Sequence, residues 1–97
     1  MEVKVDVTDT KATVTVDGKL TVQTAPDLET AINEIDPQVT NLDIDLANVD
    51  YISSAGLRVL VAAQKKVTAA AGNMRLLSPN DEVFEMTGLS DIFTVER

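Results

Sequence analysis

Two consecutive serines, Ser53 and Ser54, are the residues of this chain whose type and position could support chemistry. A hydrophobic strand pattern precedes them and a long apolar helix pattern follows, which predicts that they lie at the N-terminus of a helix. Backbone N–H groups there have no partner within the helix, and the helix dipole favours negative charge. A phosphoryl group attached to either hydroxyl would therefore occupy a favourable anion site. Serine is also a common N-cap residue, so capping alone is the alternative interpretation.

The sequence lacks the usual catalytic partners of a serine hydroxyl. It contains no histidine and no cysteine, and its four glycines are isolated from one another, so no glycine-rich phosphate loop is present. Asp43 and Asp45 share one face of a predicted strand and could bind a divalent cation, although a solvated strand face is the favoured interpretation. The sequence thus predicts a protein that is acted upon, without a metal or other cofactor, and not an enzyme.

Length and composition predict a single domain over residues 1–97, with no linker and with 44% hydrophobic residues to form one core. No apolar run is long enough to span a bilayer, and the first residues have no signal-peptide pattern, so a cytoplasmic location is expected. The net charge of -8 argues against nucleic acid or an anionic membrane as a partner. The acidity favours solubility or, alternatively, steering toward a basic partner.

Hydrophobic periodicity predicts an α/β domain in which helices pack against a mixed β-sheet, in the order β-β-α-β-α-β-α-β. An antiparallel hairpin is expected first, with turn signals at residues 8–11 and at Asp17-Gly18. Thr24 is the predicted cap of the first helix, and Gly72 is the predicted end of the second. The expected strands are 3–7, 12–16, 42–46, 74–77 and an edge strand at 92–95, and the expected helices are 24–36, 54–71 and 78–89.

Small residues follow the two serines. Ala55 and Gly56 would leave a neighbouring hydroxyl accessible to a large partner. A glycine in the first turn of a helix costs about 1 kcal/mol relative to alanine, so its presence favours close approach of a partner at this point.

The segment from Asp45 to Leu57 resembles the signature of the STAS domain, as found in bacterial anti-sigma factor antagonists. Residues 18–28 resemble the second strand and the start of the first helix of that family, and residues 78–93 resemble its third helix and closing segment. The resemblance covers nearly the whole chain, in order, and implies a single STAS-like domain.

In that family the phosphorylated serine lies two residues before the signature glycine, which here is Ser54, with Ser53 as a possible second acceptor. The resemblance implies that the unphosphorylated protein binds an anti-sigma factor with a serine-kinase fold and so frees a sigma factor. The kinase then phosphorylates the antagonist, which dissociates, and a metal-dependent serine phosphatase resets it. The implied partner surface comprises Thr21, Val22, Ser53, Ser54, Ala55, Gly56, Leu57 and Arg58. Leu57 has a core role as its alternative.

Two departures from the family pattern bear on this expectation. The family often has acidic residues at the positions of Ser53 and Thr21, so their replacement bears on the efficiency of phosphorylation or on the kinase that performs it.

The alternative function is that of an unphosphorylated STAS regulatory subunit of an ABC-type lipid or anion transport complex. Binding of a small ligand such as a nucleotide ranks last, because basic residues are few. The family is usually monomeric alone, and the sequence shows no large apolar edge that would require a dimer.

Overall fold

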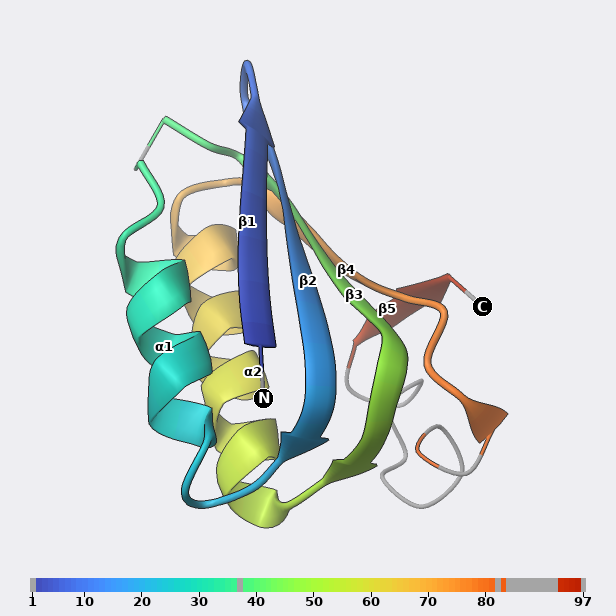
Figure 1. The fold of residues 1–97 in the computed structure, drawn as a ribbon. Helices are drawn as coiled ribbons and strands as arrows, with labels where there is room; N and C mark the ends of the chain where they lie inside the picture. The colour runs from blue at the N-terminus through green and yellow to red at the C-terminus, as the bar shows by residue number, and fades with distance from the viewer. Residues whose placement is uncertain (1, 37, 82, 84–92, 97) are drawn as a thin grey trace.

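The computed structural model describes residues 2–36, 38–81, 83 and 93–96. A five-stranded sheet has the order β1-β2-β3-β4-β5, and α1 and α2 lie together on one side of it (Figure 1). β1 is antiparallel to β2, and the other neighbouring strands are parallel. The predicted mixed sheet with packed helices is confirmed. Its elements are β1 (Glu2–Thr8), β2 (Lys11–Leu20), α1 (Ala25–Asn33), β3 (Asn41–Ile52), α2 (Ser54–Ala69), β4 (Asn73–Leu77) and β5 (Thr94–Glu96).

The first hairpin has the turn expected at residues 8–11, where Asp9 adopts a φ of 55°. The second predicted turn, at Asp17-Gly18, is wrong, because β2 continues to Leu20. The pairing of β2 with β3 instead shifts twice in this region, between Thr15 and Asp17 and between Gly18 and Lys19. Gly18 has a φ of 114°, a conformation that favours glycine. The turn-like signal therefore marks an irregularity within one long strand.

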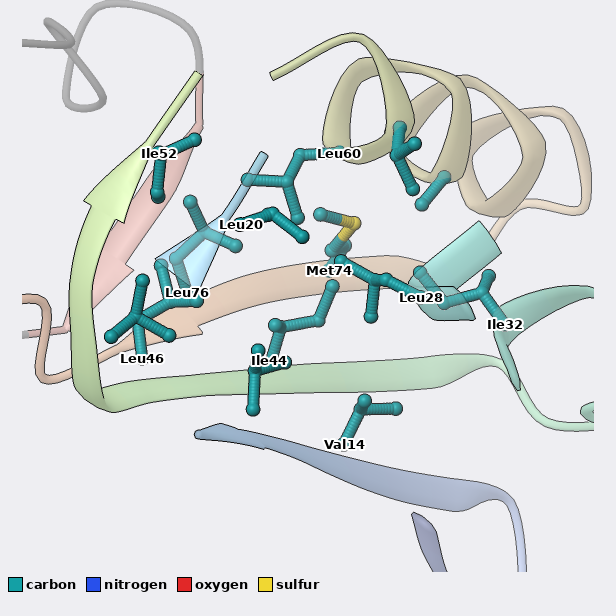
Figure 2. Close-up of a cluster of buried hydrophobic side chains, with 14 of the residues drawn as sticks. Val14, Leu20, Leu28, Ile32, Ile44, Leu46, Ile52, Leu60, Met74 and Leu76 are labelled. Atoms are coloured by element: carbon teal, nitrogen blue, oxygen red, sulfur yellow. The ribbon is translucent and has the colours of Figure 1, made fainter. Parts of the chain in front are cut away.

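The hydrophobic core lies between the sheet and the two helices (Figure 2). The predicted apolar faces are confirmed, since alternate residues of β2, β3 and β4 point toward the helices. Removing each such side chain from water contributes about 1.5–3 kcal/mol. Among the largest fully buried side chains are Leu20, Leu28, Ile44, Leu46, Leu60 and Leu76.

The end of α2 shows two distinct roles for neighbouring residues. The helix ends at Ala69, two residues before the last residue of the expected range 54–71, and the left-handed residue beyond it is Ala71, with a φ of 60°. Gly72 donates its N–H to the carbonyl of Val67 at 2.8 Å. A Cβ atom at Gly72 would collide with the carbonyl oxygen of Thr40. Glycine is therefore required here for close backbone packing and not for a positive φ.

The C-terminal part of the sheet is closed by β5, which pairs in parallel with β4 as an edge strand, as predicted. Most of the predicted third helix, residues 82 and 84–89, lies outside the described residues. In the described part of this segment, the Asn80 side chain donates to the carbonyl of Val49 at 2.8 Å and accepts the N–H of Val83 at 2.8 Å. No helix in the described ranges is long and apolar enough to cross a membrane.

Candidate functional site

The two serines occupy the junction between β3 and α2, and they have different roles. Ser53 is the N-cap, with an extended backbone, and its hydroxyl accepts the N–H of Gly56 at 3.3 Å. The N–H of Ser53 donates to the carbonyl of Leu20 at 2.8 Å, which ties the junction to the end of β2. Capping, which the sequence left open for both serines, therefore belongs to Ser53.

Ser54 is the first residue of α2 and its side chain is exposed. Within the described part of the chain, its hydroxyl has no hydrogen-bond partner. The first turn of α2 contains no acidic residue, so a negative charge added there meets no carboxylate within that turn. The geometry thus leaves Ser54 with an accessible hydroxyl at a helix N-terminus that favours an anion.

Gly56 is buried beneath the junction. A Cβ atom at this position would lie 2.7 Å from Cγ and 2.9 Å from Cδ2 of Leu20, and 3.2 Å from Cγ2 of Ile52. The core of the domain itself therefore makes a close approach that requires glycine here, and the contact of Gly56 with a partner stays a prediction. The glycine allows the first turn of α2 to pack on the ends of β2 and β3.

The hydrogen bond from the N–H of Ser53 to the carbonyl of Leu20 places the loop between β2 and α1 next to this junction. Thr24 stands at the N-cap position of α1, but its side chain makes no capping bond, contrary to the sequence-based prediction. Its hydroxyl instead donates to the carbonyl of Lys19 at 2.7 Å and accepts the N–H of Thr21 at 2.8 Å. These bonds hold the loop that presents Val22, whose side chain is 72% exposed.

The structure brings the predicted partner residues of two segments, 21–22 and 53–58, to the same end of the sheet (Figure 1). Ala55 and Leu57 are half-buried. Leu57 packs against the core, which agrees with its alternative role as a core residue. Arg58 is exposed, four residues after Ser54. Leu57 and Arg58 also line a shallow groove along α2 with Val61, Ala62 and Lys65.

Tyr51 is a surface residue that the sequence reasoning did not select. It lies two residues before Ser53, is 44% exposed, and pairs in register with Lys19 of β2. The signal was present in the sequence, because an aromatic residue outside the core-facing alternation of a strand is a candidate contact residue. Beside it, Lys19 and Asp50 form an exposed ion pair at 3.7 Å.

Asp43 lies on the sheet face away from the helices, and the prediction of a solvated face is wrong for it. Asp43 is only 3% exposed. Hydrogen bonds from Arg75 hold the pKa of the Asp43 carboxyl below its usual range, against the effect of burial, and Lys11 acts in the same direction. Asp45, half-buried, accepts the N–H of Ala47 at 2.9 Å. In the described ranges, there is no group of three aspartate, glutamate, histidine or cysteine side chains that could hold a metal ion.

An apolar cavity of about 100 Å³ lies between the C-terminal halves of the two helices. It is smaller than the ~300–1,000 Å³ pockets that hold drug-sized ligands. Its mainly apolar lining offers little to a phosphate group, so it does not support the nucleotide hypothesis. Ile32, Ile35, Asp36, Val39, Leu42, Lys66, Val67 and Ala70 line it.

Comparison with known proteins agrees with this geometry. The family model described as the STAS domain matches residues 2–97. The chain belongs to the STAS domain family. An anti-sigma-B factor antagonist of Staphylococcus epidermidis is 33% identical over 88 residues, which cover 87% of this STAS chain and 82% of the relative. The corresponding antagonist of Staphylococcus aureus is 32% identical over the same coverage.

Solved structures show the same STAS architecture. An anti-sigma factor antagonist from Mycobacterium paratuberculosis is 28% identical, with a TM-score of 0.79 over 98% of this chain and 84% of that one. The Bacillus cell fate determinant SpoIIAA in its phosphorylated form has a TM-score of 0.75 over 99% of this chain and 92% of its own. That protein is 19% identical, so the second likeness concerns the STAS fold alone.

Proposed function

We propose that this STAS domain is an anti-sigma factor antagonist and that phosphorylation of Ser54 switches it. The observation that carries the proposal is the division of roles at the junction, where Ser53 caps α2 and Ser54 keeps an exposed hydroxyl. The names of the relatives as anti-sigma factor antagonists support the same function.

In the proposed cycle, the unphosphorylated domain binds an anti-sigma factor with a serine-kinase fold and thereby releases a sigma factor. The kinase transfers the γ-phosphoryl group of ATP to the Ser54 oxygen, so that the P–O bond to ADP breaks and the hydroxyl proton is lost. The modified domain dissociates. A metal-dependent serine phosphatase then hydrolyses the phosphoserine with water and restores the hydroxyl.

The surroundings of Ser54 fit a surface that binds in one state and not in the other. Exposed Val22 and Tyr51 provide apolar contact area at the same end of the sheet. Phosphorylation would add a charge of about −1.5 to −2 at this surface, and desolvating that charge within an interface is costly. The N-terminal end of the α2 dipole, and Arg58 at the i+4 position, favour the same charge in the isolated domain. The partner would thus be released while the fold is retained.

The test uses matched variants of the two serines as baits in a lysate of the source bacterium. Wild type and Ser54→Ala should retain an anti-sigma factor with a kinase fold, whereas Ser54→Asp should not. The captured kinase with ATP should add one phosphate to wild type and to Ser53→Ala, and none to Ser54→Ala, as read by tandem mass spectrometry. Phosphate on Ser53 alone would contradict the assignment of the switch. Capture of an ABC-type ATPase without any kinase would favour the transport-subunit alternative.

A further inference from the structure

The open edge of β1 carries two valines that the domain leaves in contact with water. Val5 is 37% exposed and Val7 is 51% exposed. They pair with Val14 and Ala12 of β2, whose side chains are fully buried, so all four lie on the helix-facing side of the sheet. β1 is the first strand of the sheet and, among the strands that the structure describes, it pairs only with β2 (Figure 1). Its other edge therefore presents free backbone groups beside exposed apolar side chains.

We infer that β1 is an interface for a second copy of this chain, joined antiparallel about a twofold axis at Val5. In this register Val5 lies opposite Val5 of the second copy, and Val3 lies opposite Val7. On the other face, Lys4 of each copy lies opposite Asp6 of the other, so two ion pairs form. Lys4 and Asp6 are exposed, and neither has an ion-pair partner within the described ranges.

The charge pattern of β1 selects this register against its neighbours. Residues directly opposite each other in two paired strands must point to the same face of the sheet. The twofold axis therefore lies between one residue of the strand and the same residue of the second copy. An axis at Lys4 would place Lys4 against itself and Glu2 against Asp6, and an axis at Asp6 would place Asp6 against itself. Like charges directly opposite each other destabilise a strand pair. The axis at Val5 is the arrangement that pairs both charges and covers the exposed valines.

The paired edges would form one continuous sheet through both copies, with the helices of both on the same side. This contact differs from the monomer expected from the sequence. Because β2 lies between β1 and β3, the interface leaves the junction that carries Ser54 free. The inference is therefore independent of the proposed function of that serine.

The first test is a charge-reversal experiment by sedimentation equilibrium, carried up to ~1 mM protein because small interfaces belong to the weak class. Wild type should form dimers. Lys4→Asp and Asp6→Lys should each raise the dimer dissociation constant roughly tenfold, since two attractive cross-strand pairs become repulsive. An equimolar mixture of the two variants should restore association, because opposite charges face each other again. Dimers that neither reversal weakens would overturn the assignment of β1.

The second test uses the absence of native cysteine in the chain. In the inferred register, Val5→Cys meets its own counterpart at a Cα separation of about 5.5 Å and should form an intermolecular disulfide on oxidation. Val7→Cys is the matched control, because its counterpart would lie roughly 13 Å away along the strand. Cross-linking of the control equal to that of Val5→Cys would overturn the register. A wild type that stays monomeric, with no cross-link at position 5, would overturn the interface.

Discussion

Arg75 of β4 donates two hydrogen bonds to the carboxylate of Asp43, from Nε to Oδ1 at 2.9 Å and from Nη2 to Oδ2 at 2.7 Å. The two residues are direct cross-strand partners. Lys11 of β2 approaches the same carboxylate at 3.2 Å. One buried acid thus joins three adjacent strands on the face of the sheet that α1 and α2 leave open, and paired charges of this geometry are among the stronger polar contacts.

We expect Asp43→Asn to lower the free energy of unfolding by about 2 kcal/mol, because it weakens charge-assisted hydrogen bonds to a buried group. Partial exposure of Arg75 and Lys11 keeps the loss below that for a fully buried pair. The measurement is urea denaturation at pH 7. Asp45→Asn on the same strand is the control and should change stability by less than about 0.5 kcal/mol, since among the described residues the Asp45 side chain bonds only to the N–H of Ala47. Equal losses for the two variants would contradict the role of the Arg75 contact.

The same pair predicts a pH dependence. The folded protein lowers the pKa of Asp43, so its stabilising contribution is present above the unfolded value of about 3.9 and is lost as pH falls through the folded pKa. The stability advantage of wild type over Asp43→Asn should therefore be constant near neutral pH and should shrink below about pH 4. Denaturation of both proteins across this range measures the difference. An advantage that grew toward acid pH would have the wrong sign for this mechanism.

Gly56→Ala should destabilise the domain, although alanine in a helix is ordinarily better than glycine by about 1 kcal/mol. The added methyl group would lie 2.7 Å from Cγ of Leu20, and overpacking of this kind costs about 1–3 kcal/mol. We expect the clash to outweigh the helix preference. In a double-mutant cycle with Leu20→Ala, measured by chemical denaturation, the alanine at position 56 should become neutral or stabilising. Independent effects of the two changes would show that Leu20 is not the obstacle.

The two serines should separate in a stability measurement. Ser53→Ala removes the cap of α2 and should cost about 1 kcal/mol or less, because the bond to Gly56 is long at 3.3 Å. Ser54→Ala should leave the thermal midpoint nearly unchanged, since the hydroxyl has no partner in the described part of the chain. Differential scanning calorimetry compares them. A larger loss for Ser54→Ala would reverse the assignment of cap and free hydroxyl.

Thr24→Val should lower stability by about 1 kcal/mol, because it keeps the shape but removes the hydroxyl that links Lys19 and Thr21. Thr30→Val, on the exposed surface of α1, is the matched control and should have little effect. Hydrogen exchange gives a second measure, since the Thr21 amide should lose protection in Thr24→Val alone. Unchanged protection would show that the hydroxyl does not hold the loop.

Sequence periodicity by itself determined the order and type of the strands and helices that the structure describes. Alternating residues such as Leu42, Ile44 and Leu46 predicted a core face that the structure confirms. The paired serines between a strand and a helix, with the STAS-like pattern around them, also located the junction that the structure places at the end of β3. These are local signals, because the period of an element depends only on residues a few positions apart.

Tertiary structure decided the details that depend on which distant residues meet. Gly56 is required by Leu20, and Asp43 is buried by Arg75, at sequence separations that no periodicity reports. The exposure of Val5 and Val7 likewise follows from the position of β1 at the edge of the sheet, although their alternation matches that of buried strands. The division between Ser53 and Ser54 was settled by where the backbone changes from extended to helical. Register and strand order set these contacts, and both arise only when the whole sheet is assembled.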